Sequence, residues 1–135
     1  MLLAIDTSSL VLSCALAEKD KLVAEWTVQK RLTHSEQLIP HMDEILKDAG
    51  VDQKEITAIA AAKGPGSFTG LRIGLATAKT AAYIWKVPLI GVDTLEALVW
   101  NLVGARAFIL PLLDAQRGNV YAAMYGSFDE IWQGG

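Results

Sequence analysis

The sequence predicts an α/β fold in which helices cover a mixed β-sheet. Two observations support this fold class. Short apolar runs separated by turn residues fill positions 2–28, as in a series of strands, and apolar residues at helical spacing begin after position 33. The chain has 135 residues, of which 52% are hydrophobic. That length and content are enough for one domain or two small lobes with a core.

The first three predicted elements are strands, at residues 2–5, 11–17 and 21–28. Thr7-Ser8-Ser9 separates the first two strands, and Glu18-Lys19-Asp20 separates the second from the third. Turn-forming residues in such short connections favour hairpins. We therefore expect an antiparallel meander.

A helix is predicted next, over residues 33–49. Thr33 and Glu36 have the spacing of a capping box, and Gly50 stands where a C-cap glycine belongs. Pro40 lies inside this span, and a proline removes one backbone hydrogen bond from a helix. The helix therefore either kinks at Pro40 or begins later than Thr33.

Strands and helices alternate in the rest of the chain. Asp52 and Glu55 cap one further turn. The elements that follow are a strand at 56–62, a helix at 70–85, a strand at 88–92, a helix from Asp93 to about Val103, and strands at 108–113 and 119–125 joined by residues 114–118. The predicted order is βββ-α-β-α-β-α, followed by ββ.

The helix predicted at residues 70–85 is apolar on more than one side. On a helical wheel, one side carries Leu71, Leu75, Ala78 and Ala82, and the other carries Ile73, Ala76, Thr77, Thr80 and Ile84. The span has no acidic residue, and Arg72 and Lys79 are its only charges. A helix that lies on a sheet in a monomer normally has a polar outer face. Either a partner protein covers this helix or the first helix of the same chain does.

Composition argues against several classes of function. The formal net charge is −3, the sequence pI is about 5.3, and Lys and Arg are scattered along the sequence. A protein that binds nucleic acid on its own usually has a basic stripe. The lone cysteine, Cys14, cannot form an intrachain disulfide and suits a reducing compartment. No apolar run approaches the ~20 residues that span a bilayer, and no signal peptide is visible. We expect a soluble cytoplasmic protein without membrane contact.

Two loops are candidates for anion or nucleotide binding. The loop that begins Gly64-Pro65-Gly66-Ser67 leads from a strand into a helix, where backbone N–H groups can face a phosphate. Its glycine spacing is not that of a P-loop, and a structural turn is the competing interpretation. Asp6-Thr7-Ser8 closes the first strand, where it would either hold a metal-nucleotide or cap its own turn. The candidate residues for nucleotide binding are Asp6, Thr7, Ser8, Gly64 and Gly66.

No catalytic or metal-binding residue is predicted. His34 and His41 are seven positions apart, which on a helix is two turns or ~10.5 Å of rise, too far to share a metal ion. The sequence has neither an HExxH nor a CxxC pair. Cys14 alternates with apolar neighbours as a core residue does, and Ser67 has no identifiable base.

Five motifs occur in a characteristic order. They are Leu3-Ala4-Ile5-Asp6-Thr7-Ser8, the run THSEQLIP from Thr33 to Pro40, the run GPGSFTGLRIG from Gly64 to Gly74, VPLIGV from Val87 to Val92, and DAQRGNVY from Asp114 to Tyr121. Together they resemble the TsaB family, formerly YeaZ, of the actin-like ATPase superfamily. The resemblance implies an actin-like (ribonuclease H-like) first lobe over residues 1–104 and the incomplete start of a second lobe over residues 105–135.

The resemblance also implies a function. Members of this family take part in making threonylcarbamoyladenosine in tRNA, beside the catalytic relative TsaD and the small ATPase TsaE. The positions of the TsaD metal-binding histidines are Thr94 and Leu98 here, so the resemblance implies a non-catalytic scaffold subunit without a metal. It also implies a homodimer when the chain is alone, indirect contact with tRNA, and ATP only at a complete interface with a partner.

Pairing in this family is implied to use the first two helices. The candidate interface residues are Leu38, Met42, Ile73, Ala76 and Thr80. Two other functions stay open: a nucleotide-binding regulator that uses Asp6 and the Gly64 loop, and a glycoprotease-type peptidase. The peptidase requires paired metal ligands, which the sequence does not show.

Overall fold

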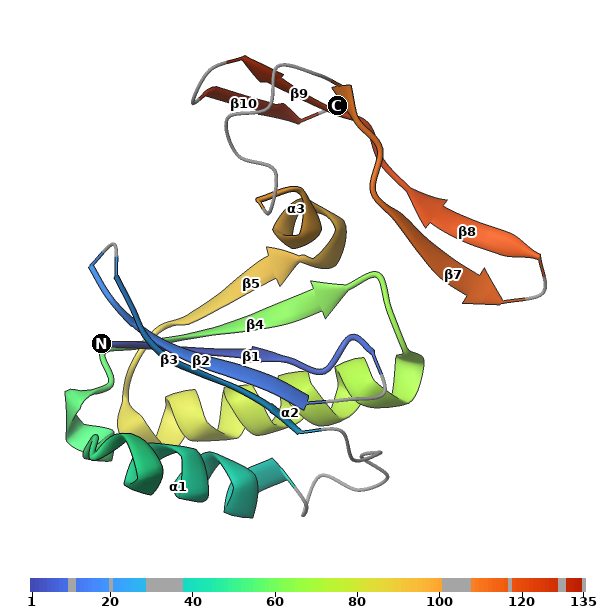
Figure 1. Ribbon diagram of the computed structural model, residues 1–135. Helices are drawn as coiled ribbons and strands as arrows, with labels where there is room; N and C mark the ends of the chain where they lie inside the picture. Colours follow the sequence, from blue (N-terminus) through green and yellow to red (C-terminus); the bar gives the residue numbers. More distant parts are fainter. Residues whose placement is uncertain are drawn as a thin grey trace.

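The computed structural model describes residues 1–9, 12–19, 21–28, 38–100, 108–116, 118–128 and 131–134. Its main layer is a five-stranded sheet, and helices α1 (Leu38–Ala49) and α2 (Phe68–Trp85) lie together on one face of that sheet. The short helix α3 (Thr94–Val99) lies on the other side, at the end of β5 (Figure 1). The predicted α/β class is confirmed.

The sheet mixes antiparallel and parallel strands in the order β3-β2-β1-β4-β5. Strands β1 (Leu2–Asp6), β2 (Leu12–Glu18) and β3 (Lys21–Val28) form the expected antiparallel meander. β1 also pairs in parallel with β4 (Ala58–Gly64), which pairs in parallel with β5 (Leu89–Asp93). The carboxyl ends of β1, β4 and β5 therefore meet at one edge of the sheet.

Helix α1 begins at Leu38, later than the prediction from Thr33. Pro40 consequently lies in its first turn, where a backbone N–H has no partner within the helix and the missing donor costs nothing. The predicted capping pair Thr33 and Glu36 lies outside the described residues. The further turn predicted after Gly50 is present as the 3₁₀ helix η2 (Gln53–Glu55), and Asp52 and Glu55 form its capping box.

The strands predicted at 108–113 and 119–125 are each divided in two. The first becomes β6 (Phe108–Ile109) and β7 (Leu112–Gln116). Pro111 lies between them, and proline has no N–H to give to a strand ladder. The second becomes β8 (Asn119–Ala122) and β9 (Tyr125–Phe128). β8 pairs with β7, whereas β9 pairs with β6 and β10 (Ile131–Gly134), so the two halves belong to different small sheets.

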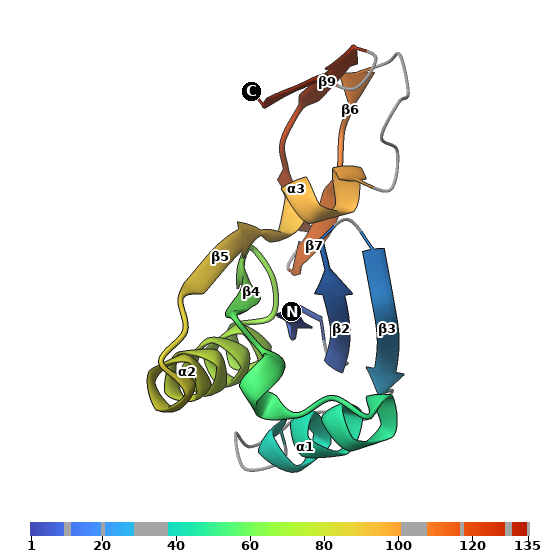
Figure 2. The ribbon, with the colours of Figure 1, turned by 90° about the vertical axis from the view of Figure 1, so that its left-hand side faces the viewer.

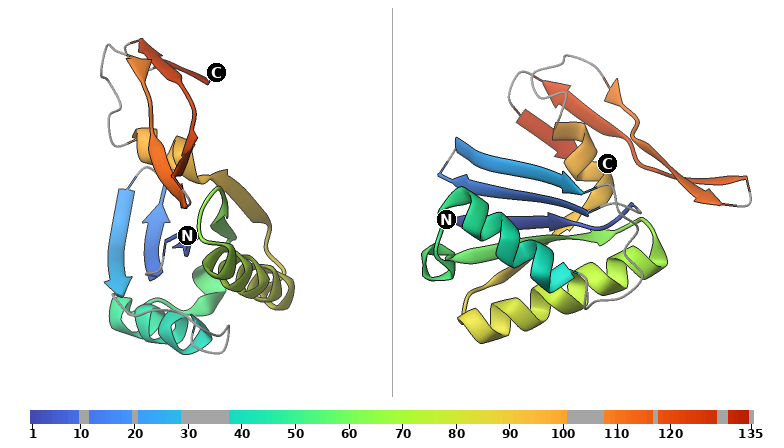
Figure 3. Two further views of the ribbon diagram at one scale, coloured as in Figure 1. Left: turned by 90° about the vertical axis from the view of Figure 1, so that its right-hand side faces the viewer. Right: turned by 60° about the horizontal axis from the view of Figure 1, so that its bottom comes forward.

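The core fills the space between the five-stranded sheet and the two helices. Alternate residues of the strands point toward the helices, as period-two burial requires. Buried side chains of this core include Leu3, Leu12, Leu16 and Ile59 from the sheet and Met42, Ile45, Leu46, Ile73 and Ala78 from the helices. Figures 2 and 3 show α1 and α2 side by side on this face of the sheet.

The predicted boundary between two lobes near residue 104 falls among residues 101–107, which lie outside the described residues. On either side of it, the described strands belong to separate sheets: β1–β5 before it, and β6–β10 after it. The assignment of residues 105–135 to a second lobe stays a prediction.

Candidate functional site

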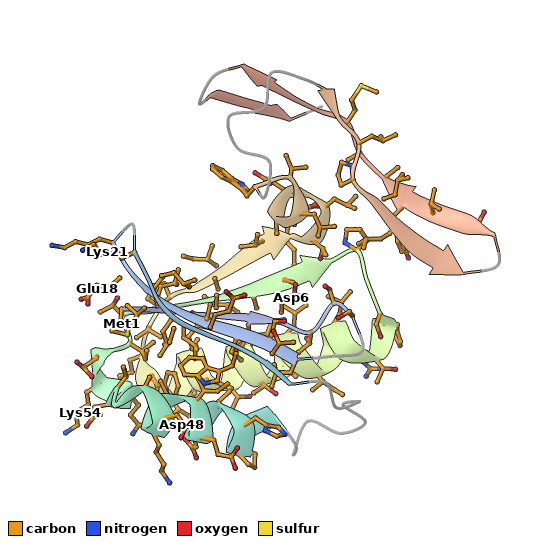
Figure 4. The ribbon with its side chains drawn as sticks, viewed as in Figure 1. Met1, Asp6, Glu18, Lys21, Asp48 and Lys54 are labelled. Carbon is orange, nitrogen blue, oxygen red and sulfur yellow. The ribbon has the colours of Figure 1, made fainter. Side chains whose placement is uncertain are left out.

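The loop after β1 and the loop after β4 come together at one edge of the sheet. β1 and β4 are parallel neighbours, with Ile5 opposite Ala61, so both strands end on the same side. Figure 4 shows Asp6 at this end of β1, opposite the end where Met1 lies. The topology therefore brings the two predicted nucleotide-binding loops side by side. The carboxyl edge of parallel strands is where α/β proteins commonly bind ligands.

The Asp6 carboxylate closes its own turn. Its Oδ1 atom accepts hydrogen bonds from the Ser8 backbone N–H at 2.8 Å and from the Ser8 hydroxyl at 2.6 Å. Aspartate side chains commonly stabilise turns in this way. The geometry is that of the competing interpretation of the Asp6-Thr7-Ser8 motif, in which the side chains cap a turn.

N–H groups of the loop after β4 and of the first turn of α2 donate hydrogen bonds within the chain. The Ser67 N–H donates to the Ser8 carbonyl at 2.6 Å, and the Gly70 N–H donates to the Ser67 Oγ at 3.2 Å, which caps α2. The Leu71 N–H donates to the Ser67 carbonyl at 2.8 Å. An anion at this helix N-terminus would compete with these bonds. The contacts favour a structural turn that joins the two loops.

Helix α2 exposes a stripe of aromatic, basic and small side chains to solvent. We call this the outer stripe of α2, defined as Phe68, Arg72, Ala76, Thr80 and Tyr83. Phe68 is 73% exposed and Tyr83 is 85% exposed. The Arg72 guanidinium carbon lies 5.2 Å from the centroid of the Phe68 ring. The Thr80 hydroxyl donates to the Ala76 carbonyl at 2.9 Å, so it is satisfied within the helix.

The structure buries two of the five predicted interface residues within the chain. Ile73 is only 7% exposed and Met42 only 4%, and both belong to the core. The reason is that α1 packs against that flank of α2, so the first helix of the same chain covers part of the apolar surface. Ala76 and Thr80 are exposed, as an interface requires, and the Leu38 side chain lies outside the described residues. The interface itself stays a prediction.

Three residues that the sequence predicts to be non-catalytic, Thr94, Leu98 and His41, lie within the described ranges. Thr94 is the first residue of α3 and is buried, while Leu98 of the same helix is exposed. His41 Nδ1 lies 3.8 Å from a carboxylate oxygen of Glu44 one turn away on α1, and His34 lies outside the described residues. Over the described ranges, no three His, Cys, Asp or Glu side chains gather as metal ligands do. Helices long and apolar enough to cross a membrane are likewise absent from the described part of the chain.

A pocket of about 180 Å³ lies against the sheet and was not predicted. Alanines from several strands line much of it, including Ala4, Ala15 and Ala60, and the carboxylates Asp6 and Glu25 also line it. These alanines were the available signal in the sequence, because they leave one face of neighbouring strands without large side chains.

Comparison with known proteins identifies the family. The model of TsaD, described as tRNA N6-adenosine threonylcarbamoyltransferase, matches residues 28–133. The chain belongs to this family, on its TsaB (YeaZ) branch. It is 39% identical over 124 residues to the Bacillus subtilis tRNA threonylcarbamoyladenosine biosynthesis protein TsaB, covering 92% of the chain and 54% of that protein. It is 36% identical over 137 residues to the Escherichia coli TsaB protein, covering 98% of the chain and 58% of that protein.

A solved structure supports the same branch and the fold. YeaZ from Pseudomonas aeruginosa matches with a TM-score of 0.81 at 28% identity, over 99% of this chain and 64% of that one. The predicted resemblance to the TsaB family and its actin-like fold class is confirmed. This TsaB-family chain spans little more than half the length of the curated relatives.

Proposed function

We propose that this chain is a non-catalytic subunit in the synthesis of threonylcarbamoyladenosine in tRNA, and that it binds a TsaD-type catalytic partner through α2. The names of the Bacillus subtilis and Escherichia coli relatives support the process. The outer stripe of α2 is the observation that supports binding of a partner through this helix. It exposes two aromatic rings on a helix whose 18 residues include no acid.

The outer stripe has the chemistry of a helix-binding surface. Aromatic residues and arginine are enriched among residues that dominate binding energy at interfaces, and the stripe has Phe68, Arg72 and Tyr83. Between them stands Ala76, whose small side chain allows a second helix to approach closely. Burial of each large aromatic ring contributes ~1.5–3 kcal/mol before the costs of association are subtracted.

The proposal includes the finer roles that the family resemblance implies. The same helix surface pairs two copies of the chain when TsaD is absent, and a TsaE-type ATPase joins the complex. The partner holds the tRNA, because this chain has a net charge of −3 and its Lys and Arg residues are scattered along the sequence. Any nucleotide binds where the partner completes the site. The role is in the cytoplasm, the compartment that the lone cysteine also favours.

Size-exclusion chromatography with light scattering, on the chain mixed with a purified TsaD-type protein, tests the proposal. Ala76→Glu places a charge at the centre of the outer stripe without disturbing the core, and we expect it to remove the complex. Leu22→Glu is the matched control, because Leu22 is an exposed apolar residue on β3. A complex that survives Ala76→Glu, or that Leu22→Glu removes equally, would refute the α2 interface.

A further inference from the structure

The loop between β1 and β2 is attached to the beginning of α2. The Thr7 hydroxyl donates a hydrogen bond of 2.7 Å to the Gly70 carbonyl, 63 positions away in the sequence. Next to it, the Ser67 N–H donates to the Ser8 carbonyl at 2.6 Å. Thr7 is only 2% exposed, so its hydrogen bond is shielded from water. A hydrogen bond is stronger in such a buried place than in water.

Two glycines of α2 leave the space that Thr7 fills. A Cβ atom at Gly74 would overlap the Thr7 hydroxyl oxygen and lie 3.1 Å from the Thr7 Cβ. A Cβ atom at Gly70 would overlap the Thr7 backbone carbonyl oxygen. The spacing of these glycines places both on the helix side that faces the loop. We call the space above Gly70 and Gly74 the Thr7 seat.

Thr7 lies between the two residues that close the turn. Asp6 accepts two hydrogen bonds from Ser8, so the three residues behave as one small unit. The unit is bound to α2 on the inner side of the helix, whereas the outer stripe lies on the other side of the same helix. A displacement of the first two turns of α2 therefore moves Thr7 and, through it, Asp6 and Ser8.

We propose that Thr7 is a positioning residue that couples the outer stripe of α2 to the Asp6–Ser8 turn. A protein bound on the stripe stabilises the attachment of the turn, and by linkage a ligand that orders the turn strengthens binding on the stripe. The presence of a partner on the stripe rests on the proposed function. The seat itself rests on the contacts of Thr7 with Gly70 and Gly74.

A size exchange tests the seat. Gly74→Ala and Thr7→Ala each lower the urea midpoint, the first by steric overlap and the second by loss of a buried hydrogen bond. In the double variant the methyl group introduced at position 74 enters the space that the hydroxyl leaves. If the two substitutions acted independently, their effects on the equilibrium constant of unfolding would multiply. We expect the constant measured for the double variant to be about tenfold smaller than that product. Additive changes in the free energy of unfolding would overturn the inference that the Thr7 hydroxyl fills the space above Gly74.

Gly70→Ala is the matched control for this exchange. The overlap at Gly70 involves the backbone carbonyl of residue 7, which no side-chain change removes. Thr7→Ala should therefore fail to rescue Gly70→Ala. Equal rescue at both glycines would show that the effect is general loosening of the loop, and it would overturn the assignment to the Thr7 hydroxyl.

Hydrogen exchange at the Ser8 amide tests the coupling. On addition of the TsaD-type protein we expect this amide to exchange about tenfold more slowly, because opening of the turn becomes rarer. Thr7→Ser keeps the donor and should keep the response. Thr7→Val keeps the shape without the donor and should lose the response while still forming the complex.

The outcomes separate the two proposals. A slowed Ser8 amide in the Thr7→Val complex, or an unchanged amide in the wild-type complex, would overturn the coupling and leave the proposed function in place. Absence of any wild-type complex would overturn the proposed function together with the coupling.

Discussion

Cys14 gives the stability of this fold a dependence on alkaline pH. It lies in β2, opposite Ile5 of β1 and Trp26 of β3, and is 2% exposed. Burial raises the pKa of the Cys14 thiol from 9.0 to about 12. The native state therefore holds the thiol proton more tightly than the unfolded state does. This contribution to stability is complete below pH 9.0 and is lost as the pH rises toward 12.

The magnitude follows from the size of the shift. The rise in the Cys14 pKa from 9.0 to about 12 corresponds to roughly 4 kcal/mol in the free energy of unfolding. Roughly 3 kcal/mol of this is lost by a pH of about 11. We propose urea unfolding at several pH values from about 8 to 11, for the wild type and for Cys14→Ala, which lacks the titrating thiol. Other groups titrate in both proteins, so the difference between the two isolates Cys14.

Over this pH range, the free energy of unfolding should fall by roughly 3 kcal/mol more in the wild type than in Cys14→Ala. Parallel dependence of the two unfolding free energies on pH would refute the assignment, because it would mean that the thiol ionises as easily in the folded chain as in the unfolded one.

Three further predictions concern individual side chains. Ile59→Ala should lower the unfolding free energy in urea by ~2–5 kcal/mol, because Ile59 is fully buried in β4, an interior strand between β1 and β5; a change below ~1 kcal/mol would contradict that placement. Asp52→Ala should cost ~1 kcal/mol in thermal unfolding, since Asp52 accepts from the Lys54 N–H at 2.9 Å, and Asp52→Asn should restore most of it. Ile73→Glu should yield no folded protein by circular dichroism, because its carboxylate would be buried without a partner; a native spectrum would place Ile73 outside the core.

The proposed interface and the core use different residues of α2. Ile73 and Ala78 point inward, whereas Phe68 and Tyr83 point outward, on one helix with few charges. A substitution on the inner side would act through loss of folding, and one on the outer side through loss of binding. Variants at Ala76 therefore test partner binding more cleanly than variants at Ile73.

Local signals in the sequence predict many elements of the fold. Turn residues and apolar runs identified the β1–β3 meander, and the capping pair Asp52 and Glu55 identified η2, because these signals act between residues close in the chain. The ordered motifs identified the family for the same reason: they can be recognised without knowing what they contact.

Which residues of α2 are buried and which are exposed depends on packing between segments that are distant in the sequence. The helical wheel of α2 is apolar on several sides, so the position of α1 and of the sheet determines that Ile73 is buried and Ala76 is exposed. The sequence likewise shows Thr7 and Gly74 in two separate motifs. Their fit depends on the parallel pairing of β1 with β4, which places residues more than ~60 positions apart in contact, and a local pattern carries no information on such a contact.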